Sequence, residues 1–304
     1  MARKKKPRRS GSALWAAAVW AILALTLGIV GYACSHSEQN SQTASTTESR
    51  SASTVSPETP TPAPSSLTPE AAPTVVATPS PEAATTGPRL AIIIDDCGQW
   101  PATERAFIAL PVPLTLSVLP DVRYNHAIEH EAAAAGKGVM LHLPMETLSG
   151  VNPGPGKVTT DMDDAAITAQ VEHDLHDVDL AQGVNNHEGS KATADVRVMN
   201  AVISVLAKDG RFFIDSRTNA RSVGERIAGE HGVRTAARDV FLDNRADVDY
   251  TAGQLRQVAA LAEQNGSAIA IGHPRPTTLE ALRIVIPEMQ ARGIKFVLAS
   301  DLVR

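Results

Sequence analysis

From residue 89 onward the sequence alternates short apolar runs with longer segments of helical periodicity, and this alternation restricts the possible folds more than any other feature. Repeated strand–helix units predict a parallel sheet with helices outside it, because parallel strands must be joined by crossover connections. Seven or eight such units within residues 89–304 favour a compact, distorted (β/α)7-8 barrel over an open sheet. The apolar runs are 90–94, 114–119, 138–143, 182–184, 211–214, 240–242, 268–272 and 295–299.

The segments between these runs include five that we predict as helices. Glycines in the stretches DGR, QNGS and ARGIK stand where a helix should end before the next strand. Pro287 lies inside the last segment, and we expect a kink or break of that helix there. The five segments are Tyr124–Ala135, Asp163–Leu180, Asp195–Lys208, Tyr250–Gln264 and Thr277–Arg292.

The first 34 residues have the composition of a membrane anchor. Residues 1–12 are basic and residues 13–34 carry no charge, a length that spans a hydrocarbon core of about 30 Å as a helix. We favour an uncleaved anchor over a cleaved signal peptide, whose apolar region is usually shorter, and over a lipoprotein processed at Cys34. The basic flank predicts a single-pass protein of the inner (cytoplasmic) membrane with its N-terminus in the cytoplasm and residues 89–304 in the periplasm or outside the cell.

Residues 35–88 are rich in Ser, Thr and Pro and contain no aromatic residue. Such a segment buries too little apolar surface to offset its ordering entropy, so we expect a disordered linker. The formal net charge of the chain is −5 although its N-terminal tail is basic, so the rest is more acidic still and a nucleic-acid partner is not expected. The two cysteines, Cys34 and Cys97, provide no disulfide framework.

Carboxylate and imidazole side chains stand at or just after the C-terminal ends of most predicted strands. In a β/α barrel all these ends face one mouth, so the side chains should converge on one pocket. Histidine and carboxylate are also the ligand set of a divalent metal, with zinc the favoured ion. The residues are Asp95, Asp96, His142, Glu146, His187, Asp215, Asp243, His273 and Asp301.

Asp95 and Asp96 raise a specific question, because two adjacent carboxylates each raise the cost of ionising the other. A bound cation would resolve the conflict, since one Asp could ligate it while the other serves as a base. The alternative is a helix N-cap with a solvated neighbour. For His142, inside an apolar strand, a hydrogen-bonded core histidine is the alternative, and Asp215 and Asp243 could equally cap helices or pair with arginines.

Five stretches, taken in this order, resemble the divergent polysaccharide deacetylase family, a distant branch of the metal-dependent polysaccharide deacetylases. They are IIIDDCG, LHLPME, GVNNHEGS, FFIDSRT and AIGHPRPTTLEAL. The resemblance covers essentially residues 89–304, and the set is specific although each stretch alone is not. It implies a distorted β/α barrel of the glycoside hydrolase/deacetylase type with a zinc site.

Residue by residue, the resemblance implies that Asp96 is a metal ligand, that Asp95 is the catalytic base and that His187 is a second ligand. His142 is our candidate for the third ligand. The better-known deacetylases use two histidines four residues apart, and this chain departs from that pattern because Lys191 follows His187 at that spacing. Their Arg-Pro-Pro-Tyr motif is also missing.

His273 resembles the general acid of those enzymes, and we expect Asp215 to orient or tune it. The hypothesis is therefore a membrane-anchored, exported, metal-dependent deacetylase-like hydrolase whose partner is an envelope polysaccharide or glycan fragment. Two alternatives stay open. One is a non-catalytic glycan- or protein-binding module on the same barrel, and the other is a metal-independent glycosidase that uses Asp95 with another acid.

Overall fold

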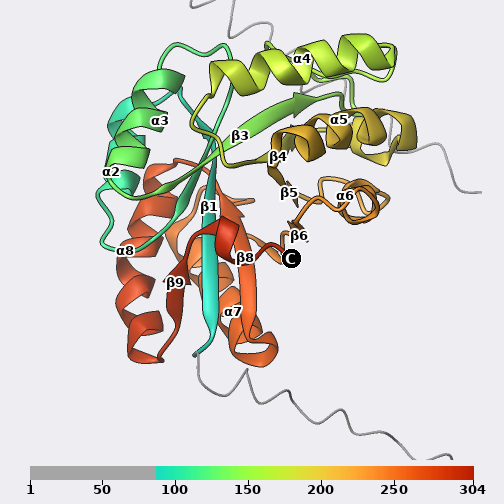
Figure 1. Ribbon diagram of the computed structural model, residues 1–304. Helices are drawn as coiled ribbons and strands as arrows, with labels where there is room; N and C mark the ends of the chain where they lie inside the picture. Colours follow the sequence, from blue (N-terminus) through green and yellow to red (C-terminus); the bar gives the residue numbers. More distant parts are fainter. Residues whose placement is uncertain (1–86) are drawn as a thin grey trace, which may run out of the picture. The chain divides into compact units, whose positions relative to one another are not determined.

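The computed structural model describes residues 87–304 (Figure 1). The predicted basic tail and membrane anchor, and all but the end of the predicted linker, fall on residues 1–86 and lie outside the described residues. Within residues 87–304, no helix has both the length and the apolar character needed to cross a membrane.

The strands of the described domain form one nine-stranded parallel sheet, with the order β6-β5-β4-β3-β2-β1-β8-β7 and with β9 paired to β1. In Figure 1 the central strand β1 (cyan) runs beside β8 and β9. The curled parallel sheet agrees with the predicted β/α barrel, although β6 and β7, at the two ends of the order, do not pair in the described part of the chain. The strands are β1 (Arg89–Cys97), β2 (Thr115–Val118), β3 (Gly138–Met145), β4 (Gly183–Glu188), β5 (Phe212–Asp215), β6 (Thr235–Ala237), β7 (Val240–Phe241), β8 (Ser267–Gly272) and β9 (Lys295–Val297).

All five predicted helices are present, with ends shifted by up to three residues. The structure adds α2, α6 and β6, which are short. We predicted a kink or break at Pro287, and the break is wrong, because α8 continues through this residue. The helices are α2 (Pro101–Ile108), α3 (Asn125–Ala134), α4 (Asp164–Asp177), α5 (Val196–Asp209), α6 (Gly224–Glu230), α7 (Val248–Asn265) and α8 (Pro276–Ala291).

Successive residues along the strands alternate between the two sides of the sheet, and each side carries an apolar cluster. On β1, Leu90, Ile92 and Ile94 join the large outer cluster that packs against the helices, whereas Ala91 and Ile93 belong to a smaller inner cluster. The inner cluster consists of Ala91, Ile93, Met140, Phe212, Ile214, Ile269, Ile271, Ala299 and Leu302. The same alternation, continued toward the C-terminal strand ends, assigns positions 95, 142, 187 and 273 to the inner face.

A buried carboxyl group lies on the outer side of the sheet, on α4. Asp174 is fully buried, and its Oδ1 accepts a hydrogen bond from Gln170 Nε2 at 2.9 Å. Its Oδ2 has no hydrogen-bond partner among residues 87–304. Burial, reinforced by the charges of Asp121 and Asp177, raises the pKa of Asp174 to about 8. The protonated form is therefore the stable one in the folded protein.

We predict that Asp174→Asn removes a pH-dependent cost to stability. The pKa is raised from an unfolded value of about 3.9, so stability is greatest below that value and falls by about 1.4 kcal/mol per pH unit as the pH rises toward 8. The stability gained by Asp174→Asn should therefore grow between pH 5 and pH 8, measured by urea denaturation at each pH. Asp209→Asn, at an exposed site on α5, is the control, and a gain independent of pH would contradict the prediction.

Candidate functional site

The C-terminal end of β1 is irregular, and this irregularity builds the site. Ile94 pairs with Leu116 and Cys97 with Val118, so three steps along β1 match only two along β2. Asp96 lies at the resulting bulge with φ of 57°, in the left-handed region that Asp tolerates better than most residues. A regular strand would point Asp95 and Asp96 to opposite faces, but here both side chains line the same cavity.

The loop that follows β1 is fixed by one buried carboxylate. Glu104 Oε1, on α2, accepts hydrogen bonds from the backbone N–H groups of Gly98, Gln99 and Trp100 at 3.0, 3.1 and 2.8 Å. Gly98 has φ of 103°, and a Cβ at this position would lie 2.7 Å from Val122 Cγ2. Glu104 therefore fixes the backbone directly after the two aspartates.

Asp96, His142 and His187 form a compact group of potential metal ligands from β1, β3 and β4. The distances are 2.9 Å from Asp96 Oδ1 to His187 Nδ1, 3.3 Å from Asp96 Oδ1 to His142 Nε2, and 3.1 Å between the two ring nitrogens. A divalent ion about 2.0–2.2 Å from each ligand atom spaces those atoms by roughly 2.8–3.6 Å. All three distances fall in this range.

The orientation of these atoms also fits a cation. Asp96 Oδ1 is buried and has no aligned hydrogen-bond partner within the described domain, although the ring nitrogen of His187 is only 2.9 Å away. A buried carboxylate oxygen without a donor is costly, and a positive ion would satisfy it. The donor set of one carboxylate and two imidazoles is the one expected for a divalent metal.

Asn185, which precedes this group on β4, links it to Asp95. Its Nδ2 donates to Asp95 Oδ1 at 2.9 Å, and its Oδ1 accepts from His142 Nδ1 at 2.8 Å. Because an amide oxygen only accepts, the proton of a neutral His142 lies on Nδ1 and leaves the Nε2 lone pair for a metal. The Ser117 and Ser216 hydroxyls complete the hydrogen bonds of the fully buried amide.

The two aspartates titrate in opposite directions. Burial raises the pKa of Asp95, against the lowering effect of nearby imidazoles and of Asn185. Burial also acts to raise the pKa of Asp96, but the adjacent rings of His142 and His187 lower it well below its usual range. The pKa of His142 is raised because the two carboxylates outweigh its own burial. Asp96 is therefore ionised and attracts positive charge, whereas Asp95 is better suited to accept a proton.

His273 reaches the same cavity from the end of β8 and is held by Asp243. Asp243 Oδ1 lies 2.9 Å from His273 Nδ1, and its Oδ2 accepts from the backbone N–H of His273 and from the Thr278 hydroxyl at 2.8 and 2.7 Å. His273 Nε2 faces Asp96 Oδ2 at 3.6 Å. Burial would lower the pKa of His273, but the hydrogen bond to Asp243 and the charge of Asp96 raise it.

Asp215 does not contact His273, and Asp243 takes the orienting position that we predicted for Asp215. On β5, Asp215 shares the strand face of Phe213, which belongs to the outer cluster. Its carboxylate accepts hydrogen bonds from the Ser222 hydroxyl at 2.6 Å and from the backbone N–H of Arg217 at 2.8 Å. These contacts hold the segment after β5.

Glu146 and Lys191 are also outside the ligand group. Their side chains form an ion pair of 2.7 Å between Glu146 Oε1 and Lys191 Nζ. The other oxygen of Glu146 accepts from the backbone N–H and hydroxyl of Thr160 at 2.8 and 2.6 Å. Lys191, at the spacing where the better-known deacetylases have a second histidine, thus fixes the loop between β3 and α4.

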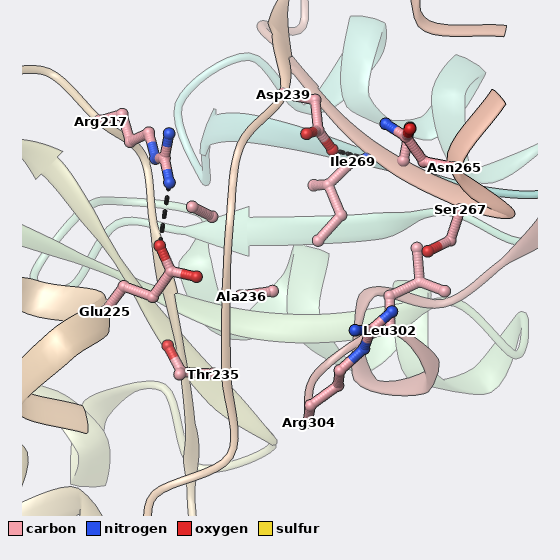
Figure 2. Close-up of a pocket in the computed structure, with 12 residues that line it drawn as sticks. Arg217, Glu225, Thr235, Ala236, Asp239, Asn265, Ser267, Ile269, Leu302 and Arg304 are labelled. Carbon is pink, nitrogen blue, oxygen red and sulfur yellow. Dashed lines mark hydrogen bonds and ion pairs between the residues drawn. The ribbon is translucent and has the colours of Figure 1, made fainter. Parts of the chain in front are cut away.

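A cavity of about 410 Å³ opens over the ligand group. Asp95, Asp96, His142, His187, Asp243 and His273 all line it. A separate cavity of about 290 Å³ lies between β6 and β8 and contains none of these residues (Figure 2). At its side Figure 2 shows the ion pair between Arg217 and Glu225. The cavity that contains the candidate metal ligands and the acid–base residues is therefore the one at the C-terminal strand ends.

Comparison with known proteins gives a family and relatives. The model of the family described as divergent polysaccharide deacetylase matches residues 92–303. An uncharacterized protein of Haemophilus influenzae is 37% identical over 195 residues, 64% of this chain and 70% of that protein. The uncharacterized protein YibQ of Escherichia coli is 34% identical over 218 residues, 71% of this chain and 67% of YibQ.

A similar fold occurs in the crystal structure of an uncharacterized protein from Agrobacterium tumefaciens C58. The TM-score is 0.69 at 24% sequence identity, with 72% of this chain and 90% of the other chain covered.

We predict that the full-length chain binds close to one equivalent of a divalent metal and that His187→Ala loses it. The mutation removes one of three converging ligand atoms. The measurement is elemental analysis after equilibration with zinc, manganese or magnesium salts and removal of excess ion. His176→Ala, at an exposed position on α4, should retain the metal. Equal metal content in His187→Ala and the parent chain would refute the assignment.

We predict that Asn185→Ala weakens metal binding by about 10–100-fold, the range typical for loss of a group that orients a ligand. The substitution leaves His142 Nδ1 and Asp95 Oδ1 without their shared partner. The affinity is measured by competition with a chromophoric chelator, and circular dichroism checks that the variant is folded. A folded variant with unchanged affinity would show that Asn185 does not position His142.

Proposed function

The chain belongs to the divergent polysaccharide deacetylase family, and we propose that it hydrolyses the acetyl amide of an envelope glycan with a divalent metal, zinc in the first instance, held by Asp96, His142 and His187. The observation that carries this proposal is the arrangement around the ligand group. Asp95 and His273 each contact a different member of it, with Asp95 Oδ2 3.5 Å from His142 Nε2 and His273 Nε2 3.6 Å from Asp96 Oδ2. A base and an acid thus flank one binding point.

A metal bound there supplies Lewis-acid polarisation of the substrate carbonyl and a water of lowered pKa. Asp95 is the base: it accepts a proton from the attacking water as the new C–O bond forms. Burial raises the pKa of Asp95 toward the range in which a carboxylate is an effective base. Asn185 holds the carboxylate through Oδ1 and leaves Oδ2 for this proton.

His273 is the acid in this proposal. Its raised pKa favours the protonated ring, whose Nε2 faces the cavity while Nδ1 is held by Asp243. His273 gives a proton to the leaving nitrogen as the C–N bond breaks, so that the products are acetic acid, which ionises to acetate, and a free amine on the sugar. The proton gained by Asp95 and the proton lost by His273 cancel, so the net reaction consumes one water.

Membrane attachment and export belong to the proposal as well. They rest on the sequence alone, namely the basic tail at 1–12 and the uncharged stretch 13–34. A linker of residues 35–88, treated as a flexible coil, reaches roughly 40 Å and more where proline stiffens it. The hydrolase domain would then act on envelope glycans some distance from the bilayer. Protease accessibility of a C-terminal tag in intact and osmotically shocked cells tests this orientation.

We predict that Asp95→Asn lowers the rate of acetate release by about 10²–10⁴-fold and leaves the metal bound. The base is lost, whereas the ligand atoms of Asp96, His142 and His187 remain. The full-length protein is assayed on N-acetylated chito-oligosaccharides and on N-acetylated peptidoglycan fragments, and its metal is measured by elemental analysis. Asp209→Asn, exposed on α5, should match the parent in both measurements.

Each other result has a defined meaning. Loss of metal in Asp95→Asn would contradict the division of labour between the two aspartates. Activity that survives chelators would favour the metal-independent glycosidase. Bound metal with no acetate release from any acetylated glycan would favour the non-catalytic binding module.

A further inference from the structure

A second cavity of about 410 Å³ adjoins the one over the ligand group. Asp96, His273 and Arg275 line both cavities, so the two lie side by side. The second is completed by Trp100 and Thr103 from α2 and its N-terminal boundary, and by Pro274 and Pro276. A substrate with its reacting group near Asp95 would extend into this space.

Trp100 gives this cavity a binding surface. It is the only tryptophan in residues 87–304, and 49% of its surface is exposed. Its backbone is fixed by Glu104 and by the start of α2 at Pro101. An exposed, positioned aromatic face next to two prolines suits the apolar C–H face of a sugar ring.

Arg275 gives the cavity a charge. Its Nη1 donates to the backbone carbonyl of Asp243 at 2.5 Å, and the guanidinium forms no ion pair with a carboxylate in the described domain. This differs from six other arginines that do form such pairs: Arg105, Arg197, Arg217, Arg226, Arg256 and Arg292. The remaining N–H donors of Arg275 are therefore available to an anion.

The surrounding charges select the kind of anion. A guanidinium presents a planar fork that matches a carboxylate with two hydrogen bonds. Four carboxylates, those of Asp95, Asp96, Glu188 and Asp243, line the adjoining cavity. These side chains repel a dianionic phosphate more strongly than a singly charged carboxylate, so a ligand carboxylate binds here more favourably than a phosphate.

We propose that this second cavity is a subsite for a carboxylate-bearing sugar, linked to the residue that loses its acetyl group, with Trp100 stacking on the ring and Arg275 binding the carboxylate. The proposal rests on the proposed function for the position of the reacting residue. It makes the substrate an acidic glycan rather than a neutral one.

Calorimetric binding to the metal-loaded full-length chain tests the subsite without requiring turnover. The probes are two disaccharides of N-acetylglucosamine, one with N-acetylmuramic acid and one with glucuronic acid, each compared with its own neutral carboxamide. At least one acid should bind tenfold or more tightly than its carboxamide. Arg275→Gln should abolish this preference, Trp100→Ala should weaken acid and carboxamide alike, and Arg283→Gln, exposed on α8, should change neither.

Equal binding of both acids and their carboxamides, or no binding of any, would overturn the proposal, as would tighter binding of N-acetylglucosamine 6-phosphate than of either acid. A carboxylate preference that survives in Arg275→Gln would also overturn it. Acetate release, measured in parallel, separates the two ideas. Carboxylate-dependent binding without acetate release would sink the hydrolase and keep the subsite, and acetate release without the preference would do the reverse.

Discussion

The structure depends on the placement of two carboxylates side by side within one cavity. The bulge at the end of β1 turns both Asp95 and Asp96 inward, although their charges repel. The imidazoles of His142 and His187 compensate Asp96, and the amide of Asn185 holds Asp95. The two carboxylates thereby take different roles: Asp96 is ionised and attracts positive charge, whereas Asp95 has a raised pKa.

Strand period made much of this site predictable from the sequence. Ala91 and Ile93 face inward, and the same count places Asp95, His142, His187 and His273 on the inner face. The same alternation places Asp215 on the outer face, which it shares with Phe213. It places Asp243, two residues after the inward Phe241, on the inner face with the site. Position at a strand end alone does not distinguish Asp215 from Asp243, and for this reason our prediction that Asp215 orients His273 is wrong.

Other parts of the site could not be read in this way. Asp96 has outward parity and reaches the cavity only through the bulge, which depends on pairing with β2. Glu104 reads as an ordinary helix residue, yet its buried carboxylate fixes the backbone after β1. Asn185 stands in a polar stretch, and its role depends on neighbours from β1, β2 and β3 and from the residue directly after β5. Such contacts are tertiary and leave no periodic trace in the chain.

The position of β1 has a consequence for biogenesis. It is the first strand of residues 87–304 to be synthesised, and its residues Arg89–Ile94 pair with Ser267–Gly272 of β8, near the other end of the domain. Its apolar edge stays open until most of the domain has been made, and pairings so distant in sequence form slowly. Nascent chains should therefore depend on chaperones to shield β1, and the ligand group from β1, β3 and β4 should precede the arrival of His273 from β8.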